Sequence, residues 1–112
     1  MEQIERIKLM EQRLEHAAAA VMDMSAALDK YIGVQGDIAE LSQYYGGEVW
    51  KKDLADDEAG LLPADLKRGV LSEDAVWNVL SDCSELNQRI AEFLNDSEEK
   101  KDKTYKTHEE KV

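Results

Sequence analysis

The stretch Tyr44–Asp74, YYGGEVWKKDLADDEAGLLPADLKRGVLSED, separates two long amphipathic segments and carries most of the unusual residues of the chain. It holds two adjacent tyrosines, a tryptophan, an acidic cluster, the only proline and a basic pair. Glycines at Gly46–Gly47, Gly60 and Gly69 divide it into short segments, because glycine interrupts regular helices. We therefore expect a region of short helices and loops that joins two long helices.

A long helix is expected over residues 2–31. Helix-favouring Glu, Gln, Arg, Lys, Leu, Met and Ala dominate this segment, and its apolar residues recur with helical spacing. The spacing of seven between Ile7, Leu14, Val21 and Leu28 is also typical of a coiled-coil seam. Two interpretations stay open. The stripe either packs inside a bundle of this chain, or it forms a seam with a partner or with a second copy.

Two short helices are expected in the middle of the chain. Either Gly33 or Gly36 is expected to end the first helix as a left-handed cap residue. Asp37 is then expected to cap a short helix over residues 37–45. A second short helix, over residues 48–59, follows the double glycine.

An ordered loop and a second long helix complete the expected fold. Residues 60–71 lack a helical period, but their four leucines and one valine are too much apolar surface for a solvated linker. Ser72 is expected to cap a long helix over residues 73–95. Cys83 falls on the apolar stripe of that helix, so we expect it to be a small buried side chain.

The expected fold class is all-α: a small helical bundle of two long antiparallel helices, residues 2–31 and 73–95. The short helices and the crossing loop would close one end of that bundle. Residues 1–95 are expected to form a single helical domain, because a chain of 112 residues supports one modest core. Residues 96–112 have no apolar period, and we expect a charged, disordered tail, with a helical extension as the alternative.

The chain is acidic, with 25 acidic and 14 basic residues and a net charge of −11. Nearly all of the excess lies in residues 1–95, which hold 19 acidic and nine basic residues. Such a field repels phosphate backbones and anionic membranes, so no nucleic-acid or membrane partner is expected. The sequence contains no signal-peptide pattern, no run near the roughly 20 apolar residues of a membrane span, and one cysteine. We therefore expect a cytoplasmic location.

An acidic cluster in the central stretch could hold a hard cation such as Mg²⁺ or Ca²⁺. Its weak candidate ligands are Asp53, Asp56, Asp57 and Glu58. Their spacing does not match a calcium-binding loop. The alternative is a solvated or salt-bridged helix face, and we favour that interpretation. We therefore expect neither a metal nor another cofactor.

Arg68 is the most informative charge in the sequence. Its planar guanidinium pairs bidentately with carboxylates, and we expect it to pair with Asp53 or Asp74 and so hold the crossing loop in place. In the alternative interpretation, Arg68 and Lys67 receive an anionic ligand near a helix N-terminus. The surrounding negative charge opposes that alternative.

Four aromatic side chains could line a small-molecule pocket: Tyr44, Tyr45, Trp50 and Trp77. More often, residues of this kind are the large packing pieces between short helices, and their polar atoms bond to nearby backbone. We favour the packing interpretation.

These motifs together resemble a known bacterial family. The pattern is YYG at 44–46, Trp50, Asp53, GLLP at 60–63 and KRGVLSED at 67–74, and it is similar to the bacterial domain-of-unknown-function (DUF) family 4298. The resemblance covers about residues 4–94, and residues 68–74 are its most specific part. It implies a short bacterial cytoplasmic protein, and it implies no activity, cofactor or catalytic residue.

Enzymatic motifs are absent from the sequence. His16 stands alone in the first helix, His108 lies in the tail, and no phosphate-binding glycine loop is present. We expect a protein–protein interaction or regulatory module rather than an enzyme, with a homodimer through the first helix as one form. The alternative is a small-ligand or divalent-cation-binding protein that uses the surface between Trp50 and Asp74. The candidate surface comprises Tyr44, Tyr45, Trp50, Asp53, Lys67, Arg68, Glu73 and Asp74.

Overall fold

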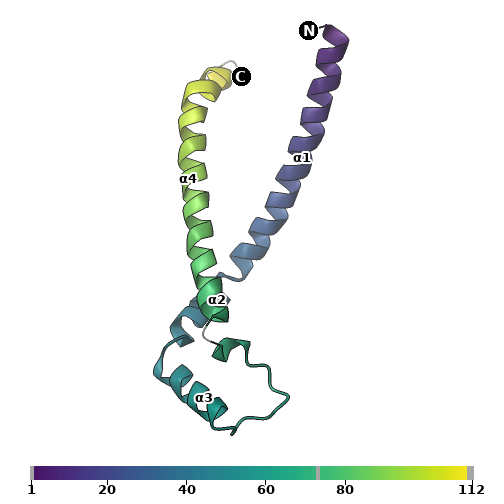
Figure 1. Cartoon of the computed structure of the whole chain (residues 1–112). Helices are drawn as coiled ribbons and strands as arrows, with labels where there is room; N and C mark the ends of the chain where they lie inside the picture. Colours follow the sequence, from purple (N-terminus) through teal and green to yellow (C-terminus); the bar gives the residue numbers. More distant parts are fainter. Residues whose placement is uncertain (1, 73, 111–112) are drawn as a thin grey trace. The chain divides into compact units, whose positions relative to one another are not determined.

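The computed structural model describes residues 2–72 and 74–110, with side chains through Lys100 (Figure 1). These residues form helices and no strand, so the all-α class is confirmed. The helices are α1 (Gln3–Gly33), α2 (Gln35–Tyr44), α3 (Glu48–Glu58) and α4 (Ala75–Glu110), with a short 3₁₀ helix, η1 (Gly69–Leu71), before α4. The expected order of a long, two short and a long helix is confirmed.

The chain divides into two units, residues 1–40 and residues 41–112. The first unit holds α1 and the start of α2. The second unit holds the end of α2, α3, η1 and α4. All described residues of the candidate surface belong to the second unit, whereas Glu73 lies outside the described residues.

α1 passes into α2 through a single-residue break at Val34. The Val34 N–H donates to the Tyr31 carbonyl at 3.3 Å, and the Val34 carbonyl accepts from the Ile38 N–H at 3.0 Å, so helical bonding resumes at once. The expected left-handed glycine cap is wrong, because neither Gly33 nor Gly36 has a positive φ. Val34 ends α1 at φ −100° and ψ 7°, a conformation open to residues with a Cβ.

The expected cap at Asp37 is also wrong. α2 begins at Gln35, which places Asp37 inside its first turn. A helix-capping residue has an extended backbone and stands just before the first turn. The break before α2 is the single residue Val34, so Asp37 is already helical and cannot be that residue. A carboxylate in the first turn still faces the positive end of the helix dipole, which is a favourable position for it.

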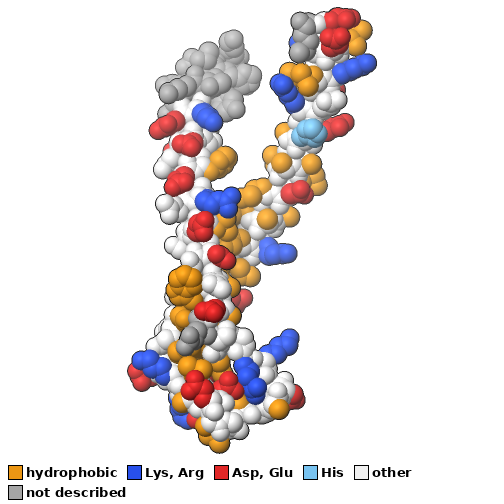
Figure 2. Space-filling model, viewed as in Figure 1, with side chains coloured by type: hydrophobic (Ala, Val, Ile, Leu, Met, Phe, Trp, Pro, Cys, Tyr) orange, Lys and Arg blue, Asp and Glu red, His pale blue; other side chains and the backbone are white. Residues whose placement is uncertain are grey.

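The apolar stripe of α1 is exposed along its length, and no residue of α1 is buried. Leu14 and Val21 keep 62% and 68% of their surface accessible, and Leu28 keeps 39%. Figure 2 shows hydrophobic side chains along much of this helix. The first unit contains no other long element that could cover the stripe. α1 therefore contributes an apolar face but no core of its own.

A glycine with positive φ follows each of the two short helices. Gly46, at φ 79°, lies in the turn that follows α2, and Gly60, at φ 75°, follows the end of α3. The Gly60 N–H donates to the Asp57 carbonyl, and the Leu61 N–H donates to the Asp56 carbonyl, both at 3.0 Å. This pair of bonds is the Schellman arrangement, in which glycine takes the left-handed position. The C-terminal end of α3, close to where the sequence predicts it, is thereby explained.

The buried core of the described residues consists of Leu71 and Val76, which keep 7% and 4% of their surface accessible. They lie in η1 and in the first turn of α4. Between them, the Ser72 hydroxyl oxygen accepts a hydrogen bond from the Ala75 N–H at 3.2 Å, which is the bond expected of a capping serine, although α4 begins at Ala75 rather than at residue 73. The same hydroxyl donates to the Gly69 carbonyl at 2.8 Å. Ser72 therefore joins η1 to α4 where the core lies.

α4 continues to Glu110, so the end expected at residue 95 is wrong. Residues 96–110 contain many Glu and Lys residues and no Gly or Pro, which explains how the helix continues without an apolar stripe. The division into a domain over residues 1–95 and a tail stays a prediction.

Cys83, expected to be buried, is half-buried, and the Asn87 amide nitrogen lies 3.8 Å from its sulfur. None of the helices in residues 2–72 and 74–110 combines the length and the hydropathy of a membrane span.

Candidate functional site

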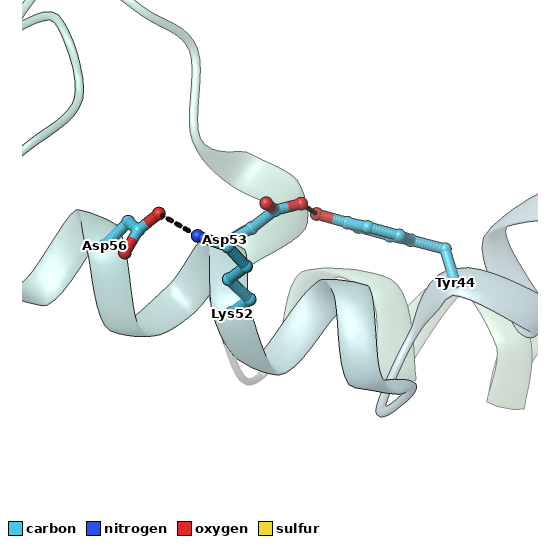
Figure 3. Close-up of polar contacts among 4 residues, drawn as sticks. All are labelled: Tyr44, Lys52, Asp53 and Asp56. Carbon is cyan, nitrogen blue, oxygen red and sulfur yellow. Dashed lines mark hydrogen bonds and ion pairs between the residues drawn. The ribbon is translucent and has the colours of Figure 1, made fainter.

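Tyr44 and Asp53 join the end of α2 to the middle of α3 (Figure 3). The Tyr44 hydroxyl donates to Asp53 Oδ2 at 2.6 Å, a short bond of the kind that carboxylate acceptors form. The turn between the two helices is tight, because a Cβ on Gly47 would lie 3.3 Å from the Tyr44 carbonyl oxygen. The hydrogen bond and the turn therefore set the position of α3 relative to the last turn of α2.

The hydrogen bond also changes the acid–base behaviour of Tyr44. It raises the pKa of Tyr44 from 10.0 to about 12, because a carboxylate acceptor stabilises the protonated phenol. Burial and the negative charge of Asp53 act in the same direction, and both are smaller causes. Tyr44 is therefore a neutral hydrogen-bond donor at physiological pH.

The three aspartates of α3 are engaged by neighbours within the chain, whereas Glu58 is exposed. Lys52 Nζ lies 3.1 Å from Asp56 Oδ2, one turn along the same helix (Figure 3). Asp57 pairs with Arg68, and Asp53 accepts from Tyr44. Among the described residues, no three His, Cys, Asp or Glu side chains gather in a way that could hold a metal ion. The paired arrangement agrees with the salt-bridged interpretation of this helix face.

Arg68 connects the crossing loop to the C-terminal end of α3. Its Nε atom lies 2.8 Å from Asp57 Oδ1, and the two side chains form an ion pair. The Nε–H bond does not point at the carboxylate, so this contact is not also a hydrogen bond. Nη2 of Arg68 donates a hydrogen bond to the Pro63 carbonyl. The expected partners, Asp53 and Asp74, are wrong. Asp53 and Asp57 lie one turn apart on α3, so sequence places both on the same side of that helix. The path of the loop brings Arg68 to the second of them.

The aromatic residues pack on one another and on backbone. The rings of Tyr45 and Trp50 meet edge to face, with centroids 5.1 Å apart and an angle of 65° between their planes. Trp50 Nε1 donates to the Val70 carbonyl of η1 at 2.8 Å. The turn after α2, helix α3 and η1 are thereby connected through one indole ring. This geometry agrees with the packing interpretation for Trp50 and Tyr45, whereas Trp77 stays 58% exposed on α4.

The remaining candidates do not join these contacts. Lys67 and Asp74 are exposed, and the Asp74 carbonyl accepts from the Asn78 N–H at 2.8 Å as part of the start of α4. The sequence does not predict two hydrogen-bond acceptors of this site, the Val70 carbonyl that accepts from Trp50 and the Pro63 carbonyl that accepts from Arg68. No sequence signal marks them, because every residue carries a carbonyl group.

A family model described as "Domain of unknown function (DUF4298)" matches residues 7–95. The chain belongs to the DUF4298 family. The match begins in α1, includes the whole candidate surface and reaches into α4. The resemblance seen in the central motifs is thereby confirmed for this DUF4298 chain. No curated protein and no solved structure matches it.

In the DUF4298 chain, Arg68→Ala is expected to lower the free energy of unfolding by about 1–2 kcal/mol and to speed hydrogen exchange in residues 60–71. The substitution removes an ion pair and a charged donor, and the effect is moderate because the Arg68 and Asp57 side chains are 33% and 23% exposed. Urea denaturation and exchange mass spectrometry measure both effects. Lys67→Ala is the control, since Lys67 is the exposed neighbour. Equal effects of the two substitutions would contradict this role of Arg68.

Tyr44 is expected to ionise about two pH units later than an ordinary tyrosine. Its folded-state pKa of about 12 lies above 10.0, so its contribution to stability is complete below pH 10 and is lost as pH rises from about 10 to about 12. Absorbance at alkaline pH, recorded on the folded chain, would show a late phase. Tyr44→Phe should remove that phase and Tyr45→Phe should keep it. Loss of the phase in both variants would count against the Tyr44–Asp53 bond.

Proposed function

We propose that this DUF4298 chain is a protein–protein interaction module whose contact face is the apolar stripe of α1. One observation carries the proposal: none of the residues of this 31-residue helix is buried, although apolar side chains follow one face of it. Contiguous exposed apolar surface of this kind marks interaction sites in soluble proteins. The seven-residue spacing of Ile7, Leu14, Val21 and Leu28 suits a helical partner.

An uncovered α1 would be a poor helix by itself. Helices in proteins gain most of their stability from packing of the apolar face rather than from intrinsic propensity. We therefore expect another helix to pack along the stripe of α1. α4 of the same chain, in the antiparallel bundle that the sequence predicts, is one possible cover, and a helix of another molecule is the other.

The candidate polar groups of the second unit are engaged within that unit. Ion pairs and hydrogen bonds among α2, α3 and the crossing loop engage Asp53, Asp56, Asp57 and Arg68. These groups are then occupied within the chain, which gives the small-ligand and cation alternative no support. The net negative charge agrees with a protein partner rather than a nucleic acid or an anionic lipid surface.

Site-specific photo-cross-linking in living cells tests the proposal. A photoreactive residue at Val21, on the apolar stripe, is compared with one at Ala19, on the opposite side of α1, in the intact chain. We expect a discrete adduct with another polypeptide from position 21 and none from position 19. Adducts from position 21 that are confined to α4 of the same chain would overturn the proposal, and so would the absence of any discrete adduct.

A further inference from the structure

We propose that the occupant of the α1 stripe is α1 of a second copy, paired antiparallel about a two-fold axis at Ala17–Ala20. The proposal rests on the interaction function above and names its partner. Three features of the chain support it: the register of the stripe, its length compared with that of α4, and the distribution of charge.

The stripe of α1 contains two sets of core positions, each repeating every seven residues. The first set is Ile7, Leu14, Val21 and Leu28, and the second set is Met10, Ala17, Met24 and Tyr31. In an antiparallel coiled coil, each residue of one set meets a residue of the other set on the facing helix. With Val21 opposite Ala17 of the second copy, every member of both sets finds a partner.

That register uses the whole helix. Its two-fold axis falls at the centre of α1 (Gln3–Gly33), so neither end is left unpaired. The same central position holds Ala17, Ala18 and Ala20 on the side of the stripe, where small side chains let two helices approach closely, whereas Ala19 lies on the opposite side of α1. In an antiparallel pair, the small residues of the two copies face each other only at the two-fold axis. If they lay near one end of α1, the axis would lie there too, and only that end of each helix would be paired.

The α4 stripe is too short to cover α1. Apolar residues of α4 at helical spacing run from Val76 to Leu94, about 28 Å of helix. The stripe of α1 runs from Ile4 to Ile32, about 43 Å. Beyond Leu94 the α4 sequence is polar and charged, so an antiparallel α4 would leave the first turns of the α1 stripe facing charged residues. A second α1 matches the length of the stripe.

Charge favours the antiparallel orientation of the two copies. α1 is almost neutral, with five acidic and four basic residues. Residues 41–100 hold 14 acidic and six basic residues, and the chain enters them after the C-terminal end of α1. A parallel pair would bring two such acidic segments to one end. An antiparallel pair attaches them to opposite ends of a helix about 46 Å long, several times the screening length of about 8–10 Å.

Pulsed electron spin resonance on the full chain tests the proposal. A spin label at Glu5 is compared with a label at Ala19, each introduced through cysteine in a Cys83→Ser background, with solution mass measured on the same samples. We expect a dimer in which the two Glu5 positions lie about 40 Å apart, because 28 residues separate each from its own mirror position. The Ala19 positions lie level with the two-fold axis but on the outer sides of the two helices, so they should be separated only by the width of the pair, on the order of 20 Å, and this label serves as the control.

Two other outcomes, a parallel dimer and a monomer, would overturn this proposal. Both can be distinguished from a result that contradicts the proposed protein–protein interaction itself. A short Glu5 distance in a dimer would mean a parallel pair. A monomeric mass at millimolar concentration would exclude the second copy, and a cross-link from Val21 to a different protein would then leave the interaction function intact. As a further check, Val21→Asp should weaken the dimer about 100-fold or more, whereas Ala19→Asp should change it less than about threefold.

Discussion

The Leu71→Ala variant is expected to lose about 2–4 kcal/mol of unfolding free energy, a large share of the stability of a small domain. Leu71 and Val76 are the two buried residues in the described part of the chain, and Leu71 keeps 7% of its surface accessible. Truncation removes buried methyl groups and leaves a cavity between η1 and the start of α4. With so small a core, few neighbouring side chains can move in to fill that cavity.

Leu61→Ala is the matched control for this prediction. It makes the same chemical change in the same crossing loop, but Leu61 is 70% exposed, so we expect a change of less than about 0.5 kcal/mol. Urea denaturation followed by tryptophan fluorescence gives both values, because Trp50 bonds to η1. If the two variants shift the midpoint equally, the core does not lie at Leu71.

The Trp50→Ala variant is expected to lose about 2–4 kcal/mol, somewhat less than a fully buried tryptophan would, because Trp50 is half-buried. The substitution removes the edge-to-face contact with Tyr45 and the hydrogen bond to the Val70 carbonyl. It therefore disconnects η1 from α3. Trp50→Phe keeps an aromatic ring but no N–H donor, and it should cost about 0.5–1.5 kcal/mol.

Trp77→Ala is the control for the tryptophan prediction. Trp77 is 58% exposed on α4, so its truncation should change the free energy of unfolding by less than about 1 kcal/mol. Circular dichroism during urea denaturation is the appropriate measurement, because it does not depend on either indole. If Trp77→Ala lowers the free energy of unfolding as much as Trp50→Ala does, the contacts of Trp50 with Tyr45 and η1 are not the cause of the loss of stability.

Much of the local structure of this DUF4298 chain could be predicted from sequence. The expected limits of the two short helices lie within two residues of α2 and α3, because glycines with positive φ stand at Gly46 and Gly60. The cap at Ser72 was also predictable, since a serine before a run with helical period has few other roles. The end of α4 was not, because Glu- and Lys-rich segments suit both a helix and a disordered tail.

The candidate site was predicted at the level of residues and only in part at the level of contacts. Tyr44, Asp53 and Arg68 were all singled out, and each makes a specific polar contact in the structure. The Tyr44–Asp53 bond was not foreseen, and Arg68 was assigned the wrong carboxylate. Both contacts depend on how α2, α3 and the crossing loop approach one another, and side-chain spacing along one helix does not contain that information.

By itself, the sequence determined the order of the helices, the glycines that end the two short ones and the apolar face of each long helix, but not where α4 ends. These properties depend on residues within about one helical turn of each other, so local propensity, glycine and capping residues decide them. Only the tertiary structure decided which atoms meet: Trp50 with the Val70 carbonyl, Tyr44 with Asp53 and Arg68 with Asp57. Those pairs join residues 9 to 20 positions apart, and the path of the backbone through the turns between them determines which pairs come within bonding distance.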